Sequence, residues 1–110
     1  MYKIVVSIIV CVMLSFGTVF AYDMKYIHMI QSLEKTNHMN LKDSKRSKYY
    51  ISPSLWKGFD NKEKEMFVNM VLYYNLYLGN EAAVTIHYMS NNKMVAMGAA
   101  DGIKIYQFKD

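Results

Sequence analysis

The chain has 110 residues, thirteen of them basic and nine acidic, which gives a net charge of +4. Its one cysteine, Cys11, lies inside an apolar leading segment. A chain of this size buries roughly 60–65% of its extended surface on folding, which is enough for one small core. The composition therefore excludes a multidomain protein and, once the leading segment is removed, thiol catalysis and thiolate metal sites.

Residues 1–21 have the pattern of a secretory signal peptide. Lys3 gives a positive start, the seventeen residues 4–20 carry no charge, and Val19 and Ala21 suit the two positions that a signal peptidase inspects. We expect cleavage after Ala21, which would place residues 22–110 in the periplasm or outside the cell. The processed chain would have no cysteine and a net charge of +3, because only Lys3 among the charged residues is lost.

Two other interpretations of the leading segment remain open. The first is an uncleaved membrane anchor, because seventeen apolar residues approach the ~20 that cross a bilayer. The second is a lipoprotein, which fits poorly because Cys11 lies in the middle of the apolar run rather than at its end. The mass of the mature N-terminus distinguishes these alternatives from cleavage.

The first element expected after the leading segment is a helix over residues 23–36. Tyr26, Ile30 and Leu33 recur at helical spacing, and Asp23 is a suitable N-cap. We expect this helix to pack against the rest of a single domain spanning residues 22–110.

A polar, basic stretch over residues 36–48 follows and predicts a solvated linker within the domain. Tyr49-Tyr50-Ile51 then forms a β-like run ended by Pro53, and Ser54-Leu55-Trp56 predicts a short turn of helix ending near Gly58. The aromatic and aliphatic side chains of this segment are expected to cap the core. One flank of the sheet needs cover, so either the β-like run adds an edge strand or the first helix packs on the mixed face.

A long helix is expected from Asp60 to about Leu78. Asp60 and Glu63 have the spacing of a capping box, and Gly79-Asn80 favours a left-handed exit from the last turn. The apolar face consists of Phe67, Met70, Val71, Tyr74 and Leu78. Further apolar residues broaden this stripe, so the second half of the helix is expected to be buried on most sides.

After Asn80 the apolar period changes from 3.6 to 2, which predicts strands. Two-residue turns at Asn91-Asn92 and Asp101-Gly102 would pair Ile86 with Met97 and Met97 with Tyr106. The expected core face is Val84, Ile86, Tyr88, Val95, Met97, Tyr106 and Phe108. The expected opposite face is Thr85, His87, Met89, Met94, Ala96, Gly98, Ile103, Ile105 and Gln107. The predicted fold is therefore α+β: one long C-terminal-half helix packed on a three-stranded antiparallel β-meander, with an additional N-terminal helix.

No catalytic or cofactor motif is recognisable in the sequence. The three histidines lack the helical spacing of a metal pair, and there is no glycine-rich phosphate loop. Glu63 and Glu65 lie two residues apart on a helix and point to different faces, which suits a solvated turn. We therefore expect a protein that is not an enzyme, binds no cofactor and, given its compartment, does not bind nucleic acid.

The preferred function is a binding or interaction module acting in the cell envelope or outside the cell. Aromatic side chains combine large contact area with a polar tip, and three of them adjoin the basic stretch. The candidate partner-binding residues are Tyr49, Tyr50, Trp56, Lys45, Arg46 and Lys48. The partner would be an envelope or extracellular protein or polymer, and a homodimer through the mixed sheet face or an open edge strand is a further hypothesis.

A weaker alternative is an exported copper-binding protein. An imidazole lies near a thioether three times in the sequence, and such ligands suit copper in a chain without thiols. The candidate ligands are His28, His38, His87, Met29, Met39 and Met89. Against this, neighbouring residues of a strand point to opposite sides, and methionine commonly fills gaps in a core.

Overall fold

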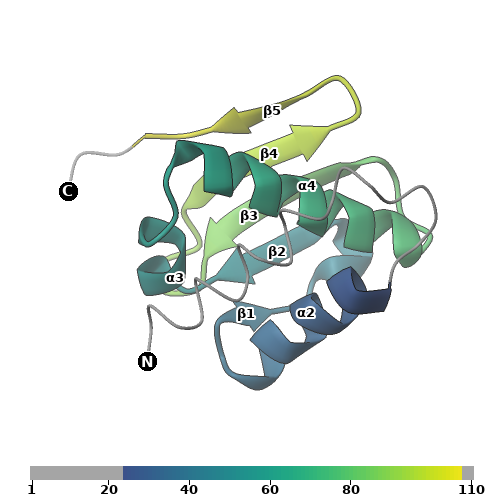
Figure 1. Ribbon diagram of the computed structural model, residues 1–110, viewed down its shortest axis with the longest axis horizontal. Coiled ribbons are helices and arrows are strands. Elements are labelled where there is room, and N and C mark those ends of the chain that lie inside the picture. The colour runs from purple at the N-terminus through teal and green to yellow at the C-terminus, as the bar shows by residue number, and fades with distance from the viewer. Residues whose placement is uncertain (1–23, 108–110) are drawn as a thin grey trace.

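A computed structural model describes residues 24–107 of the chain (Figure 1). The elements in order are α2 (Met24–Lys35), β1 (Met39–Asn40), the 3₁₀ turn η2 (Ser44–Arg46), β2 (Lys48–Ile51), α3 (Pro53–Lys57), α4 (Asn61–Tyr77), β3 (Ala83–Tyr88), β4 (Met94–Ala99) and β5 (Gly102–Ile105). The expected signal peptide, the expected cap Asp23 and the expected core residue Phe108 lie outside the described residues.

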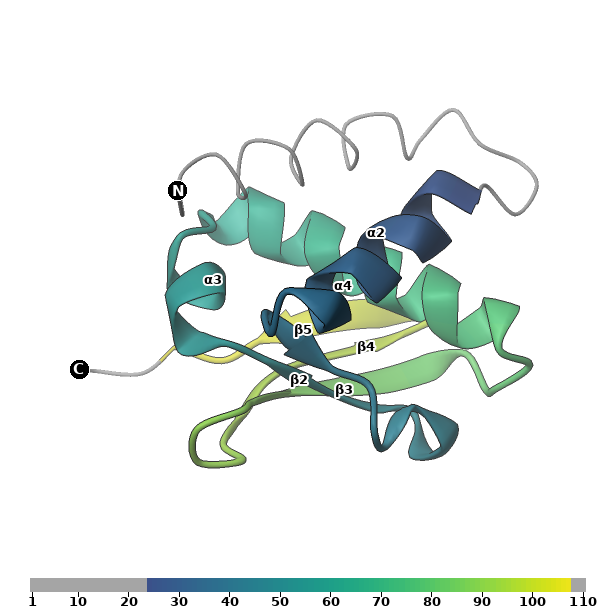
Figure 2. The same ribbon diagram turned by 90° about the horizontal axis from the view of Figure 1, so that it is seen from below.

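The strands form one five-stranded sheet in the order β1-β2-β3-β4-β5. Neighbouring strands are antiparallel except for β2 and β3, which run parallel. Figure 2 shows α2, α3 and α4 together on one face of this sheet. The α+β class is therefore confirmed, and the predicted three-stranded meander is wrong in extent, because it is part of a five-stranded mixed sheet.

The two additional strands come from the segment whose structure was hardest to predict. β2 is an internal strand, hydrogen-bonded to β1 on one side and to β3 on the other. The stretch expected to be a solvated linker supplies both β1 and η2. A two-residue strand is too short to show alternation, and a parallel partner distant in sequence leaves no turn signal between the strands.

The long helix begins and ends as expected. Asp60 is its N-cap: the Asp60 side chain accepts a hydrogen bond from the Glu63 backbone N–H, and the Glu63 side chain accepts one from the Asp60 backbone N–H, both at 2.8 Å. At the other end Gly79 has φ +85°, and the Asn80 N–H donates to the carbonyl of Asn75. This closes the last turn with the glycine in the left-handed region that its missing Cβ allows.

The second half of α4 is less buried than expected. Phe67, Met70, Val71 and Tyr74 are buried, but the last turn ends with Leu76, Tyr77 and Leu78 exposed. The described helices form a single layer, so the outward side of α4 has no described element over it (Figure 2). The prediction of burial on most sides is wrong for this last turn.

The strand faces were predicted correctly only as far as Val95. The β3–β4 loop is longer than the predicted two residues, because residues 89–93 lie between the strands; the Tyr88 N–H donates to the Lys93 carbonyl, and Asn92 has φ +61°. That change shifts the pairing by two residues and preserves the faces.

A β-bulge then inverts the faces. His87 pairs with Met94 and Ile86 with Ala96, so Val95 is the extra residue of β4. A one-residue shift moves every later side chain to the other side of the sheet. Met97 and Tyr106, expected in the core, lie on the side away from the helices. The residues that replace them on the helix side are Ala96, Gly98, Ile103 and Ile105.

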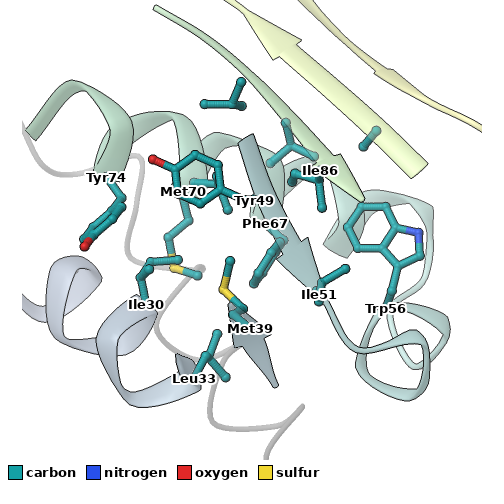
Figure 3. Close-up of a cluster of buried hydrophobic side chains, with 14 of the residues drawn as sticks. Ile30, Leu33, Met39, Tyr49, Ile51, Trp56, Phe67, Met70, Tyr74 and Ile86 are labelled. Carbon is teal, nitrogen blue, oxygen red and sulfur yellow. The ribbon is translucent and has the colours of Figure 1, made fainter. Parts of the chain in front are cut away.

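The core lies between the sheet and the helix layer, and every described helix contributes to it (Figure 3). Ile30 and Leu33 come from α2, confirming the face predicted for that helix, and Trp56 comes from α3. Phe67 and Met70 of α4 meet the strand residues. The strand side of this cluster includes Met39, Tyr49, Ile51 and Ile86. Each fully buried large side chain contributes roughly 1.5–3 kcal/mol to folding.

Candidate functional site

The sheet has one face that no described helix covers, and we name it the helix-free face. The side chains that the strand pairings place on it include Lys48, Tyr50, Thr85, His87, Met97 and Lys104. Two loops project on this side at opposite ends of the sheet, the η2 segment and the β3–β4 loop (Figure 2). The helix-free face therefore lies between these two loops.

Tyr50 lies on the helix-free face next to the η2 segment. Its hydroxyl donates a 2.6 Å hydrogen bond to Asp43 Oδ2, and the ammonium groups of Lys42 and Lys48 lie 5.2 and 5.4 Å from its ring centroid. The hydrogen bond from Tyr50, followed by the nearby cations Lys42, Arg46 and Lys48, holds the pKa of the Asp43 carboxyl below its ordinary value. The η2 segment is thus tied to the sheet rather than freely solvated.

His87 occupies the other side of Tyr50. The two ring centroids are 5.9 Å apart, and the imidazole is 7% exposed. Its Nδ1 lies 3.0 Å from the Asn92 carbonyl oxygen and its Nε2 lies 3.0 Å from the Thr85 hydroxyl. Both ring nitrogens are therefore engaged within the protein, which orients the β3–β4 loop against the sheet.

A hollow of about 540 Å³ lies beside these groups, at the start of β3 and the end of β4. Thr85, Met97 and Ala99 are among its lining residues. The charged residues that line it are Arg46, Glu81, Asp101 and Lys104. The volume falls in the range of small-ligand sites, and the mixed lining can bind both a polar and an apolar group.

The structure separates the residues predicted to bind a partner. Tyr49 and Trp56 are buried in the core at 0% and 2% exposure, and Tyr50, on the helix-free face, is also buried, at 5% exposure. Tyr49 and Tyr50 are neighbours in a strand and must point to opposite sides. Lys45 and Arg46 are exposed on η2, and Lys48 is half-buried at the start of β2. Tyr50 and the three cations therefore share one side of the molecule, away from the other two aromatic side chains.

The candidate copper ligands are also dispersed. His28 is exposed on α2 and His87 lies on the helix-free face, so the sheet separates them. Met39 is buried, and Met29 packs against the core. His38 and Met89 lie at the same end of the sheet, since the His38 carbonyl accepts from Ser52 N–H and the Met89 N–H donates to the Ile51 carbonyl. Within residues 24–107 there is no group of three His, Cys, Asp or Glu side chains that could hold a metal ion.

Sequence reasoning missed a buried amide on α4. Asn75 is 0% exposed, and its Oδ1 accepts from the Tyr49 hydroxyl at 2.7 Å and from Asn80 Nδ2 at 2.9 Å. Its Nδ2 donates to the Ser47 hydroxyl and to the carbonyls of Glu81 and Ala83. The signal was an amide among apolar residues in a helix predicted to be buried. Asn75 fixes Ser47 and Glu81, two residues that line the hollow.

No family model matches the sequence, and no curated protein or solved structure matches it significantly. Among the described residues, no helix is long and apolar enough to cross a membrane.

Proposed function

We propose that this protein is a small, exported, non-catalytic binding module that acts in the periplasm or outside the cell. Its partner would be an envelope or extracellular protein or polymer, bound on the helix-free face. The observation that supports this most is the make-up of that face: an exposed methionine, Met97, beside a hollow whose rim carries charged side chains of both signs.

Charge favours a partner that carries acidic groups. The side of the molecule formed by η2 and the helix-free face presents Lys42, Lys45, Arg46, Lys48 and Lys104. The acidic residues there are Asp43, Glu81 and Asp101, and Asp43 is already hydrogen-bonded to Tyr50. A surface with this excess of cations attracts anionic groups and orients them as they approach.

Site-directed photo-crosslinking in cells tests the proposal. A photoreactive residue in place of Met97, which is 40% exposed, is expected to capture a partner. The matched position is Gln31, an exposed residue of α2 on the helix side. The expected result is a partner recovered from position 97 and absent from position 31. Equal recovery from both positions, or none from position 97, contradicts the proposal.

Two double variants test how much the cations beside the hollow contribute to partner binding. Arg46→Ala with Lys104→Ala removes two cations that line the hollow, whereas Lys35→Ala with Lys62→Ala removes two exposed cations from the helices. Both double variants lower the net charge equally. We expect only the first to reduce partner recovery, and a loss of the same size in the second would assign the effect to net charge alone.

Export is a separate part of the proposal, because the leading segment lies outside the described residues. It is supported by the apolar run of residues 4–20 and the processing site at Ala21. The mature protein is expected to begin at Tyr22 by mass spectrometry. An N-terminus at Met1 would instead support the uncleaved membrane anchor.

A further inference from the structure

The sheet ends at β5, and nothing in residues 24–107 pairs with the outer side of this strand. Figure 1 shows β5 as the outermost strand on its side of the sheet. The opposite edge strand, β1, has two residues, whereas β5 has four. A residue of an edge strand that faces away from the sheet leaves its N–H and C=O without a strand partner. β5 is therefore the longer of the two open edges.

The hydrogen bonds to β4 fix which residues of β5 face outward. The Tyr106 N–H donates to the Val95 carbonyl at 2.9 Å, while Ala96 is paired with Ile105. In an antiparallel ladder this makes Ala96 and Ile105 a pair without mutual hydrogen bonds, and the two kinds of pair alternate. Ile103 and Ile105 therefore direct their N–H and C=O groups away from β4. Within the described part of the chain, no residue forms a hydrogen bond with these four groups.

The side chains along this edge alternate in character. Ile103 and Ile105 are half-buried and pack against the core on the helix side, where α4 contacts β5. Lys104 is exposed on the helix-free face, paired with Met97, and its ammonium lies 5.2 Å from the Tyr106 ring centroid. Lys104 is also the only charged residue of β5. An added strand would therefore meet apolar side chains on one face and a cation on the other.

A second copy of this chain fits the edge poorly. If β5 pairs with itself so that both isoleucines of each copy are hydrogen-bonded, Ile103 lies opposite Ile105. This register brings the two copies of Lys104 face to face. Like charges directly opposite one another destabilise a sheet, whereas opposite charges stabilise it. The acidic residue nearest in sequence, Asp101, lies in the preceding turn, outside the strand. The charge of β5 therefore favours an acidic partner over self-pairing.

We propose that the partner is held by strand addition: an extended segment of a protein pairs with β5 as a further strand of the sheet. This inference rests on the function proposed above and specifies the chemistry of the partner. The segment carries an acidic residue opposite Lys104, and apolar residues on either side of it lie beside Ile103 and Ile105. Backbone hydrogen bonds to the two isoleucines provide affinity, and the alternating side chains provide specificity. The added strand extends the helix-free face next to Met97.

Peptide binding tests the proposal with the protein in the form that cells produce. The probe is an end-blocked synthetic peptide in which valine and threonine alternate on both sides of one central glutamate. The comparison peptide has lysine in place of the glutamate. NMR titration measures both affinities and follows hydrogen exchange at the Ile103 and Ile105 amides. The glutamate peptide is expected to bind about fivefold tighter or more, and to slow exchange at both amides.

Two matched pairs of variants separate strand addition from other modes of binding. Lys104→Glu is expected to reverse the preference between the two peptides, whereas Lys35→Glu, at an exposed position of α2, leaves it unchanged. Ile105→Pro and Ile105→Ala both remove the isoleucine side chain, but only proline removes the outward N–H. Ile105→Pro is expected to bind the glutamate peptide about fivefold more weakly than Ile105→Ala. Circular dichroism melts verify that all variants fold.

Three results would overturn strand addition: no binding of the glutamate peptide, equal affinity for the two peptides, or a preference that Lys104→Glu does not change. A concentration-dependent dimer that Ile105→Pro abolishes and Ile105→Ala retains would also overturn it, because a second copy would then occupy the edge.

The outcome is distinguishable from that of the function proposed above. A partner captured at position 97 without peptide binding would remove strand addition alone. Peptide binding at β5 without capture at position 97 would instead remove the helix-free face as the site of the partner in cells.

Discussion

Asn75 carries more hydrogen bonds than any other side chain described above, although it lies on a helix dominated by apolar residues. A buried amide without partners is costly, so its retention depends on every donor and acceptor being satisfied. Two strands, the α4–β3 connection and Ser47, between η2 and β2, supply those partners. Their convergence depends on tertiary structure, which is why the sequence could flag the position but could not predict its role.

Asn75→Ala is expected to lower the free energy of unfolding by about 2–4 kcal/mol, because it leaves the buried Tyr49 hydroxyl and two partly buried carbonyls without this partner. Tyr49→Phe removes one of these hydrogen bonds and is expected to cost about 1 kcal/mol. Urea denaturation measures both. Asn69→Ala, at an exposed position of the same helix, serves as the control. Losses of equal size at positions 69 and 75 would contradict this account.

The hydrogen bond between Tyr50 and Asp43 is expected to make the stability of the fold depend on pH. The hydrogen bond from Tyr50 lowers the pKa of Asp43, so the ionised carboxyl is favoured in the folded protein. Such a group stabilises the fold above its unfolded pKa, and this contribution is lost as the pH falls through the lowered folded value. Tyr50→Phe is expected to raise the pKa of Asp43 toward its ordinary value, as followed by NMR of the carboxyl carbon.

Tyr106→Phe is the control for this titration, since its hydroxyl contacts Met97 Sδ rather than a carboxylate. An Asp43 pKa that is the same in the Tyr50→Phe variant and in the unaltered protein would show that the cations alone lower it.

At the scale of elements, Gly98 allows α4 to approach the sheet closely. A Cβ at this position would lie 2.6 Å from Val68 Cγ1, which is closer than two carbon atoms can pack. β4 is internal in the sheet and α4 is held at both ends, so neither can move away freely. The glycine is therefore required by the distance between two layers rather than by a turn.

Gly98→Ala is expected to destabilise the protein by about 1–3 kcal/mol through overpacking. Val68→Ala removes the opposing methyl groups, and Gly98→Ala should cost distinctly less in that background. A double-mutant cycle measured by thermal or urea unfolding gives the coupling between the two positions. Strictly additive effects would show that the glycine is needed for another reason.

Elements specified by residues close together in the sequence were predicted correctly, and those that depend on contacts between distant residues were not. The limits of α4 were predictable because the Asp60–Glu63 capping box and Gly79 are local. The inverted half of β4 was not, because a bulge at Val95 depends on which pairing packs better and leaves no mark in the turn residues. Met97 was assigned to the core for this reason, and its exposure is the clearest consequence.

At the scale of the whole molecule, the candidate site was only partly predictable. The excess of cations near residues 42–48 could be read directly from the sequence. That these cations share a surface with Met97 and Lys104 could not, because it depends on the parallel pairing of β2 with β3. The pairing brings Lys48 beside Thr85 from a distant part of the chain, and no local pattern specifies it.

The parallel pairing of β2 with β3 also predicts that the two strands unfold together, as one cooperative unit. Backbone amides of β2 and of the paired part of β3 are expected to exchange hydrogen only through global unfolding, with the same free energy in both strands. Native-state hydrogen exchange at Tyr50 and Ile86, each internal in the sheet, measures this. A lower opening free energy for β2 alone would show that the N-terminal half unfolds separately.

If the chain is exported as proposed, through a narrow channel with its N-terminus first, the parallel pairing has a kinetic consequence. β1 and β2 emerge early, but they form only a two-stranded piece, which is marginal in water by itself. The strand that completes them follows α3 and α4, so the sheet cannot close until most of the molecule has passed. Connectivity alone would therefore delay folding during such passage, and the domain would assemble on the receiving side.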